Sequence, residues 1–341
     1  PKNIVIMKRG SFRIERLLML RRTLLKIKPD IVIGQHIRDC NYLYFATLFT
    51  PIHYMVHIHG TFFWFPDDLL KYCMIFRGVF REIRESVAGH KEFIPPRPQW
   101  NFKNRMVSEV KAIVNYLGVR KARAHIVLTD QVSWEVKILY KKDSVVARGC
   151  LPPEVLSYRP REDIRKELGL EGKKIIFNVG RLDPRKRIDV LIKSYAKILP
   201  EYDDLYLLIG GTGEDQKRLK LLVKELGLEG KVIFCGFIPD AQLFDYYAAC
   251  DVFVFPSWTT SGISPYEALA VGKKVVITSE ADEPFLQDKH VFLADPNVED
   301  FAKKLHIALN TDVSGKIDLS DYTWDKYFET VYIAACRVVQ G

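Results

Sequence analysis

The 341-residue sequence has no long run of uncharged apolar residues. A membrane-spanning helix needs about 18 to 20 such residues in succession, and here Lys, Arg, Asp or Glu interrupts every hydrophobic run. The sequence therefore predicts no transmembrane helix. It also has no internal repeat and no biased tract, and 48% hydrophobic and 27% charged residues are typical of a globular protein.

Cysteines are few and scattered, and none form a CxxC pair, which argues against a zinc site and a disulfide framework and favours a reducing compartment. We interpret all six as buried apolar thiols: Cys40, Cys73, Cys150, Cys235, Cys250 and Cys336. We also find no acidic cluster of the DxD kind in a suitable loop. The sequence therefore predicts neither a bound metal ion nor a cofactor.

Positive charge is concentrated in the first part of the chain. Residues 1–150 hold 26 basic and 12 acidic residues, a surplus of +14, whereas the remainder hold 25 basic and 30 acidic residues. This asymmetry indicates an anionic partner for the first part, such as lipid phosphate, a membrane surface or nucleic acid. The alternative is a basic surface that serves only solubility.

Short runs rich in Val and Ile alternate with longer helical patterns, which is typical of βαβ units around a buried parallel sheet. We therefore expect an α/β protein. In the first half the predicted strands are Ile4–Met7, Asp30–Gly34, Tyr54–His57 and Ala124–Leu128, and the predicted helices are near Arg13–Ile27, Asp67–Ala88 and Arg105–Leu117. Because a strand follows Pro1 almost at once, we expect this sequence to begin part-way into its first domain.

The second half alternates more clearly and predicts a doubly wound sheet of six strands. These are Lys174–Val179, Leu205–Ile209, Lys231–Cys235, Val252–Phe255, Lys274–Ile277 and His290–Ala294. Prolines between residues 151 and 160 indicate an interdomain linker, and a final helix is expected at Trp324–Val339. The predicted organisation is a first domain at 1–155, a second at 156–320, and a C-terminal helix within 321–341 that packs back on the first domain.

Ligands of open α/β sheets bind at the carboxyl ends of the strands, so the turns there are the candidate site. Gly180–Lys186 combines a glycine with cations and suits a diphosphate, or is a basic surface turn. Gly210–Asp215 has three glycines that allow positive φ and close contact with a ligand. Cys235–Pro239 offers an apolar wall for a nucleobase, or belongs to the core.

The segment Pro256–Gly272 predicts the start of another helix. Ser264 as the N-cap, Pro265 at the first helical position and Glu267 at the third would form a capping box. The positive end of this helix would then lie beside Thr260–Ile263 and attract an anion or a sugar hydroxyl. Glu267 could alternatively do no more than satisfy a backbone N–H.

Taken together, these turns resemble the retaining glycosyltransferases of family 4. The resemblance is carried, in order, by Val179–Leu182 with Lys186, Gly210–Gly213, Gly236-Phe237, Asp251–Ser257 and Glu267–Gly272, and it is strong over residues 174–310. It implies the GT-B fold, in which two Rossmann-like domains face each other across a cleft and a C-terminal helix returns to the first domain.

The resemblance also implies roles for individual residues. Arg181 and Lys186 would bind the donor diphosphate, and Glu267 would hold the ribose hydroxyls. The other implied donor-binding residues are Gly180, Gly211, Gly236, Phe237, Ile238, Thr259, Ser261, Gly262 and Ile263, of which Gly236, Phe237 and Ile238 would surround the base. The family usually has a glutamate eight positions before Glu267. This sequence has Thr259 there, which puts the donor sugar, the rate or the activity itself in question.

The first half resembles the family more loosely, in Lys28–Ile33 and Val56–Phe62. His59 occupies the place of a histidine that lies near the donor sugar in this family, which implies a catalytic role beside Arg181 and Lys186. His57 and His36 are weaker candidates. Between Phe62 and Trp100, many aromatic and aliphatic residues are accompanied by basic residues. This is typical of an interfacial helix that lies on a membrane or shapes an acceptor groove, or of an ordinary packed helix.

The leading functional hypothesis is retaining transfer of a hexose-type sugar from a UDP- or GDP-type nucleotide-sugar to a lipid-linked, glycolipid or polysaccharide acceptor, a step of glycan biosynthesis. We expect a cytoplasmic protein, peripheral on the inner face of the membrane, that does not bind nucleic acid. Two alternatives remain: a nucleotide-sugar epimerase of the same fold, and a non-catalytic homologue that binds nucleotide-sugar.

Overall fold

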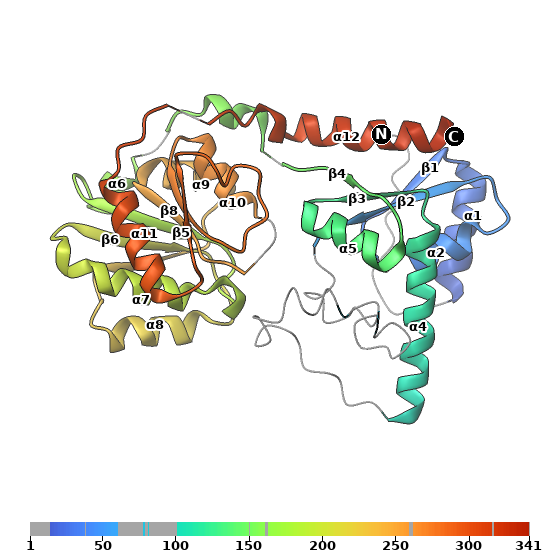
Figure 1. Ribbon diagram of the computed structural model, residues 1–341, viewed down its shortest axis with the longest axis horizontal. Helices are drawn as coiled ribbons and strands as arrows, with labels where there is room; N and C mark the ends of the chain where they lie inside the picture. The colour runs from blue at the N-terminus through green and yellow to red at the C-terminus, as the bar shows by residue number, and fades with distance from the viewer. Residues whose placement is uncertain are drawn as a thin grey trace. The chain divides into compact units, whose positions relative to one another are not determined.

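The computed structural model describes residues 14–37, 39–60, 78, 81, 101–149, 151–160, 163–258, 262–315 and 317–340. The chain forms two compact units (Figure 1). Unit 1 comprises Pro1–Val127, Val132–Val146 and Val331–Gly341, and unit 2 comprises Leu128–Gln131 and Ala147–Thr330. The predicted strand Ile4–Met7 and the predicted helix Asp67–Ala88 lie outside the described residues.

Unit 1 contains a parallel sheet with the strand order β1-β2-β3-β4. Its strands are β1 (Ile31–Gly34), β2 (His53–Ile58), β3 (Ala124–Val127) and β4 (Val145–Val146), and its helices are α1 (Ile14–Ile27), α2 (Asp39–Thr47), α4 (Phe102–Lys121) and α5 (Asp130–Tyr140). Helices α2 and α4 pack closely because Gly118 has no side chain: a Cβ there would lie 2.8 Å from the carbonyl oxygen of Cys40.

Unit 2 contains a six-stranded sheet with the order β10-β9-β8-β5-β6-β7, and every pair of neighbours is parallel. The strands are β5 (Lys174–Val179), β6 (Leu205–Gly210), β7 (Val232–Gly236), β8 (Val252–Phe255), β9 (Lys274–Thr278) and β10 (Val291–Ala294). The chain builds outward from β5 through β6 to β7, and then from β8 to β10 on the other side. The order therefore reverses between β5 and β8, which is where sheets of this type bind ligands.

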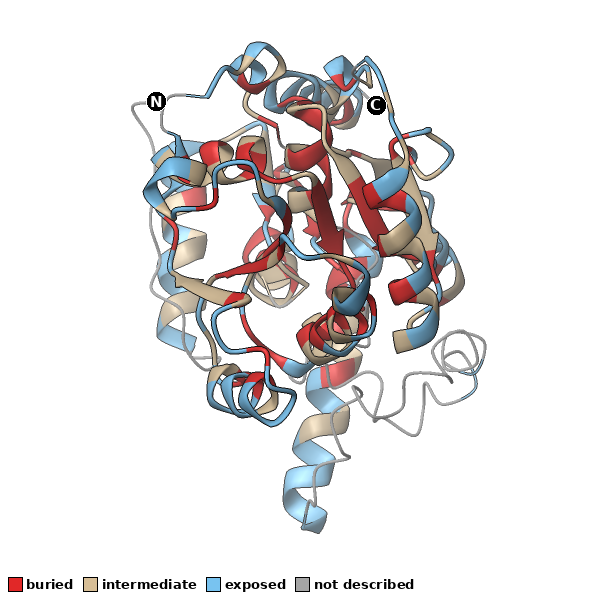
Figure 2. Cartoon of the chain, turned by 90° about the vertical axis from the view of Figure 1, so that its left-hand side faces the viewer, coloured by how far each residue is buried: buried red, intermediate tan, exposed pale blue. Residues whose placement is uncertain are grey.

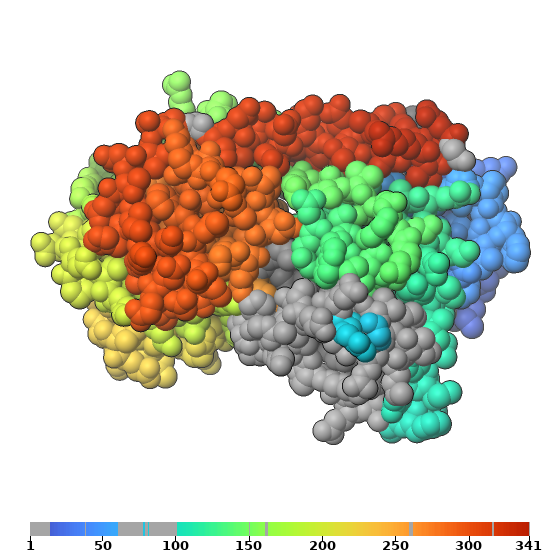
Figure 3. Space-filling model, in the orientation of Figure 1, coloured from blue at the N-terminus to red at the C-terminus, as the bar shows by residue number. Residues whose placement is uncertain are grey.

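Helices cover both faces of this sheet (Figure 2). The helices of unit 2 are α6 (Ile164–Glu167), α7 (Ile188–Ile198), α8 (Gln216–Glu225), α9 (Asp240–Ala249), α10 (Ile263–Ala270) and α11 (Val298–Asn310), with 3-10 turns η3 (Pro153–Ser157), η4 (Pro184–Lys186), η5 (Leu199–Glu201) and η6 (Ser320–Tyr322). The last helix, α12 (Trp324–Gln340), begins in unit 2, and its residues from Val331 onward belong to unit 1. Side chains alternate along β5: Ile176 joins the core beneath α7 and α11, whereas Ile175 and Phe177 join the core on the face of α9 and α10. Helices α8 and α11 lie at the surface of unit 2 (Figure 3).

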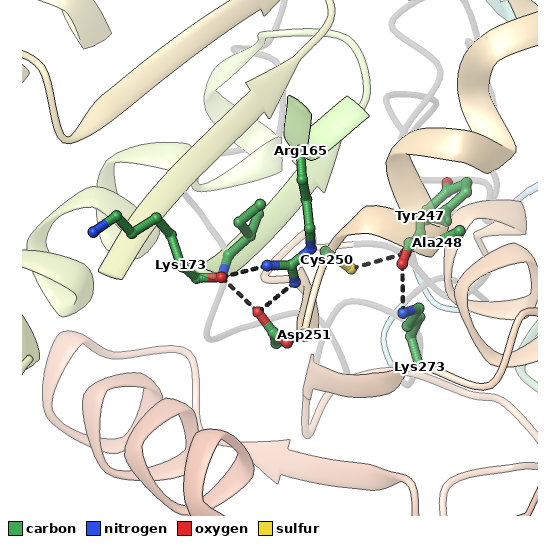
Figure 4. A network of polar contacts seen from close by, with 8 residues as sticks. Arg165, Lys173, Tyr247, Ala248, Cys250, Asp251 and Lys273 are labelled. Atoms are coloured by element: carbon green, nitrogen blue, oxygen red, sulfur yellow. Dashed lines mark hydrogen bonds and ion pairs between the residues drawn. The ribbon is translucent and has the colours of Figure 1, made fainter. Parts of the chain in front are cut away.

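A polar network fixes the amino ends of β5 and β8 (Figure 4). The Asp251 carboxylate accepts hydrogen bonds from the Ile175 N–H at 2.7 Å and from Arg165 Nη2 at 2.9 Å, and the same guanidinium donates to the Lys173 carbonyl. Lys273 Nζ donates to the Ala248 carbonyl at 2.6 Å. This network lies at the opposite end of the strands from the candidate site, so we assign it a structural role.

The predicted α/β class and all six predicted strands of the second half are confirmed, with ends that differ by at most one residue. The predicted final helix is α12, and the two-residue β4 was missed because it is too short to show a period. Cys40 and Cys250 are buried as expected, whereas Cys235 and Cys336 are only partly buried. Within the described residues, no helix has the length and apolar character required to cross a membrane.

Candidate functional site

The loops at the carboxyl ends of β5, β6 and β7 are joined backbone to backbone. The Leu182 N–H donates to the Thr212 carbonyl at 2.9 Å, and the Leu182 carbonyl accepts from the Asp215 N–H at 3.1 Å. The Gly211 N–H in turn donates to the Gly236 carbonyl at 2.6 Å. These hydrogen bonds hold the three loops of the candidate site together without a ligand.

Two of the glycines predicted to contact a ligand also make this loop packing possible. A Cβ at Gly211, where φ is +107°, would lie 1.9 Å from the Gly180 carbonyl oxygen, and one at Gly213 would lie 2.1 Å from the Leu182 carbonyl oxygen. Gly180 differs from both, because a Cβ there would meet no described atom within 4 Å. Gly180 is therefore a glycine beside which a ligand has room.

This contrast generates a stability prediction. Gly211→Ala should lower the free energy of unfolding by at least about 2 kcal/mol, because the methyl group collides with backbone and the φ is unfavourable. Gly180→Ala should change it by less than about 1 kcal/mol, since the methyl group enters open space. Urea unfolding of both variants measures the difference, and equal losses would show that the loop contact is not the constraint.

The two predicted diphosphate-binding cations lie in the loop after β5. Arg181 is exposed, and Lys186 ends η4 with its Nζ 5.4 Å from the centre of the Phe255 ring. Burial lowers the pKa of Lys186, and the Asp183 carboxylate opposes that effect. Asp183 itself caps η4 by accepting from the Arg185 N–H at 3.0 Å and also pairs with the Arg185 guanidinium. Within the described part of the chain, neither Arg181 nor Lys186 forms an ion pair.

A buried ion pair lies directly after these cations. Arg187 adopts a left-handed conformation with φ of +49° as the N-cap of α7, and its side chain is almost fully buried. Its two terminal guanidinium nitrogens, Nη1 and Nη2, donate to the Glu280 carboxylate, which also accepts from Thr278 Oγ1 at 3.1 Å. The pair joins the loops after β5 and β9. Sequence reasoning missed it, because the partners are 93 positions apart and carry no local motif.

The predicted capping box at the next helix is wrong. Helix α10 begins at Ile263 with Gly262 as its N-cap, so Ser264 lies inside the first turn. The cap comes from a distant loop: a Glu283 carboxylate oxygen accepts from the Gly262 N–H at 3.1 Å, and the other accepts from Tyr266 Oη at 2.7 Å. A protein carboxylate therefore already occupies this helix end, where the sequence suggested room for an anion.

Glu267 has a different partner from the backbone N–H expected of a capping box. Its carboxylate accepts from Tyr247 Oη of α9 at 2.7 Å, and burial raises its pKa. The nearby Ile263 is half-exposed at the start of α10. The predicted contacts Thr259 and Ser261 lie outside the described residues.

The predicted base-binding residues at the end of β7 differ in exposure. Phe237 is 75% exposed, whereas the Ile238 side chain is 7% exposed and packs in the core beneath Gly210. Gly236 has a φ of +68°, which favours glycine at this turn. The exposed apolar side chain here is thus that of Phe237, whereas the Ile238 side chain belongs to the core.

Glu283 provides a pH-dependent test of this arrangement. Burial raises its pKa from 4.5 to about 7, against the opposing hydrogen bonds from Tyr266 and Gly262. Between pH 4.5 and about pH 7 the folded protein therefore binds more protons than the unfolded chain. The contribution of Glu283 to the free energy of unfolding falls as the pH rises through this range.

In Glu283→Gln the side chain cannot ionise. The unfolding free energy of the variant minus that of wild type should therefore increase by about 3 kcal/mol as the pH rises from 4.5 to above 7. Urea titrations across this range measure it, with exposed Glu225→Gln of α8 as the matched control. A difference that stays constant with pH would contradict the claim that burial raises the pKa of Glu283.

Unit 1 brings the three candidate histidines together at the ends of β1 and β2. The ring centres of His57 and His59 are 3.9 Å apart, and those of His36 and His59 are 5.5 Å apart. Gln35 Oε1 lies 3.3 Å from His57 Nδ1 and 3.2 Å from His59 Nε2. Across the residues that the structure describes, no group of three or more His, Cys, Asp or Glu side chains is arranged to hold a metal ion.

Comparison with known sequences relates the second half of the chain to glycosyltransferases. Residues 160–318 match the family described as "Glycosyl transferases group 1". Mannosylfructose-phosphate synthase of Agrobacterium fabrum is 35% identical over 147 residues, which are 40% of this chain and 32% of that protein. Alpha-monoglucosyldiacylglycerol synthase of Streptococcus pneumoniae is 31% identical over 126 residues, or 36% and 28% respectively. The chain thus spans about a third of the length of these relatives.

Solved structures extend the likeness to both units. A glycosyltransferase from Rickettsia africae superposes with a TM-score of 0.73 at 17% identity, over 99% of this chain and 85% of that one. Anabaena Alr3699/HepE in complex with UDP gives 0.64 at 16% identity, over 95% and 79%. With two parallel-sheet α/β units, the chain has the GT-B fold, as predicted. The sequence matches thus relate residues 160–318 to glycosyltransferases, and the structural matches show the fold of both units.

Proposed function

We propose that this protein is a retaining, metal-independent glycosyltransferase that moves a hexose-type sugar from a UDP- or GDP-type nucleotide-sugar donor. The observation that carries the proposal is the loop after β5, which presents Arg181 and Lys186 without ion-pair partners among the described residues and beside the open Gly180. Two cations beside a glycine backbone can bind the two charged groups of a diphosphate. The loop also lies where the strand order reverses, which is where sheets of this type bind ligands.

The proposal assigns the parts of the donor to neighbouring loops. Arg181, Lys186 and the backbone at Gly180 bind the diphosphate. Phe237 and the backbone of Gly236 and Ile238 surround the base, and Glu267, held by Tyr247, accepts hydrogen bonds from the ribose hydroxyls. The remaining contacts to the donor come from Gly211, Thr259, Ser261, Gly262 and Ile263.

The proposed chemistry follows from the cations. When the bond between the sugar and the diphosphate breaks, negative charge develops on the departing diphosphate. Arg181 and Lys186 stabilise that charge if they are already positioned where it appears, so no metal ion is required. The neighbouring Phe255 ring and the capped η4 turn restrict Lys186, which supports this role.

For the acceptor, we propose a lipid-linked, glycolipid or polysaccharide substrate at the cytoplasmic face of a membrane, with His59 of unit 1 acting on the reacting sugar. The surplus of +14 in residues 1–150 and the name of the Streptococcus pneumoniae relative support a lipid-linked acceptor. The aromatic and basic segment Phe62–Trp100 that suggested membrane contact lies, apart from residues 78 and 81, outside the described residues.

Two alternatives make different predictions for the same assay. Thr259, in place of the family glutamate, favours a non-catalytic homologue, which would bind nucleotide-sugar without releasing nucleotide or transferring sugar. An epimerase of the same fold would instead convert the donor sugar into its epimer. Product analysis after incubation with UDP- and GDP-sugars separates the three functions.

We predict that Arg181→Ala and Lys186→Ala each weaken nucleoside diphosphate binding by roughly 1.5 to 3 kcal/mol, because each removes a charge-assisted contact to phosphate. Binding of the matching nucleoside should change little. Calorimetric titrations with both ligands test this, with Lys224→Ala on the exposed surface of α8 as the control for lost charge. Equal losses for diphosphate and nucleoside would exclude the phosphate role.

We also predict that donor turnover in excess EDTA equals that with added magnesium to within about two-fold, because the two cations stabilise the leaving group. The assay measures nucleotide release and sugar transfer on wild type after removal of divalent ions. If turnover stops in EDTA and returns with magnesium, the proposed metal-independent mechanism is wrong.

A further inference from the structure

A single amide oxygen lies beside two of the clustered imidazoles in unit 1. Gln35 follows β1 directly, His57 belongs to β2, and His59 follows β2. Gln35 Oε1 is 3.3 Å from His57 Nδ1 and 3.2 Å from His59 Nε2, so it meets a different ring nitrogen in each histidine. The parallel pairing of β1 and β2 brings these residues to one edge of the sheet.

The chemistry of the amide fixes where the protons are. An amide oxygen only accepts hydrogen bonds, so both ring nitrogens that face it must carry hydrogen. His59 is then protonated at Nε2 and His57 at Nδ1. In a neutral imidazole the other nitrogen is an acceptor, which makes Nδ1 the acceptor nitrogen of His59.

The surroundings keep both rings neutral. Burial lowers the pKa of His57 to about 4, with further lowering by His59 and His36. The pKa of His59 is lowered by burial and by His36, partly offset by a hydrogen bond with the backbone of Gln35. A carboxylate at position 35 would favour the imidazolium, whereas the uncharged glutamine orients the rings without attracting a second proton.

We propose that Gln35 is a positioning residue that holds His59 as its neutral Nε2–H tautomer and so presents Nδ1 as a hydrogen-bond acceptor for a hydroxyl group of the substrate. The part that concerns substrate rests on the proposed glycosyltransferase function. The tautomer itself does not, because it follows from groups within unit 1.

The tautomer is measured on the full chain with ¹⁵N-labelled histidine and long-range ¹H–¹⁵N spectra, with His59→Asn and His57→Asn variants used for assignment. Wild type should show His59 protonated at Nε2 and not at Nδ1 near neutral pH. Gln35→Ala should produce a mixture of tautomers. Protonation of Nδ1 in wild type, or an unchanged tautomer in Gln35→Ala, would overturn the proposal.

Gln35→Glu extends the test to titration and to activity. The introduced carboxylate should raise the pKa of His59 by about 1 or more. The acidic limb of the pH profile of sugar transfer should move upward by the same amount. If the His59 titration moves and the pH profile does not, the lone pair has no role with substrate. If neither wild type nor Gln35→Glu transfers sugar, the proposed function is wrong, and the tautomer assignment still stands.

Discussion

The packing of backbone against backbone at the ends of β5 and β6 is the constraint on which the candidate site depends. At Gly211 and Gly213 a side chain would overlap the carbonyl oxygens of Gly180 and Leu182, so the two loops touch along their main chains. The contact leaves the loop after β5 little freedom. A ligand that meets Arg181 and Lys186 then binds a largely formed site, which lowers the ordering cost of binding.

Further contacts brace the same loop at its far end. The Trp258 N–H donates to the Arg185 carbonyl at 2.9 Å, which ties the loop after β8 to η4, and the ion pair of Arg187 with Glu280 adds the loop after β9. A buried ion pair is weak evidence for stability, because the desolvation of both charges offsets their attraction. We infer that its main effect is to hold the loop that carries Arg181 and Lys186 in a fixed position relative to the loop after β9.

The sequence predicted the parts of this structure that repeat with a short period or follow a local motif. The six strands of unit 2 are short apolar runs, mostly buried in β5, β6, β8 and β9, and the turns after β5, β6 and β7 carry glycines. It could not predict that Glu283 caps α10, that Tyr247 holds Glu267 or that Gln35 contacts two histidines. These partners lie 20 or more positions apart, so their pairing depends on the sheet order. The capping box failed for the same reason: a tertiary carboxylate replaced the local one.

The central claim is that the loops after β5, β6 and β7, with the start of α10, form the binding site for a nucleoside diphosphate. Hydrogen–deuterium exchange of the intact protein with saturating UDP, GDP or ADP tests it most directly. With the nucleotide that binds, we predict slower exchange in peptides covering residues 180–187, 210–213, 236–238 and 262–267, and unchanged exchange in α8 and α11. Protection that excludes these loops, or no protection by any of the three nucleotides, would contradict the account.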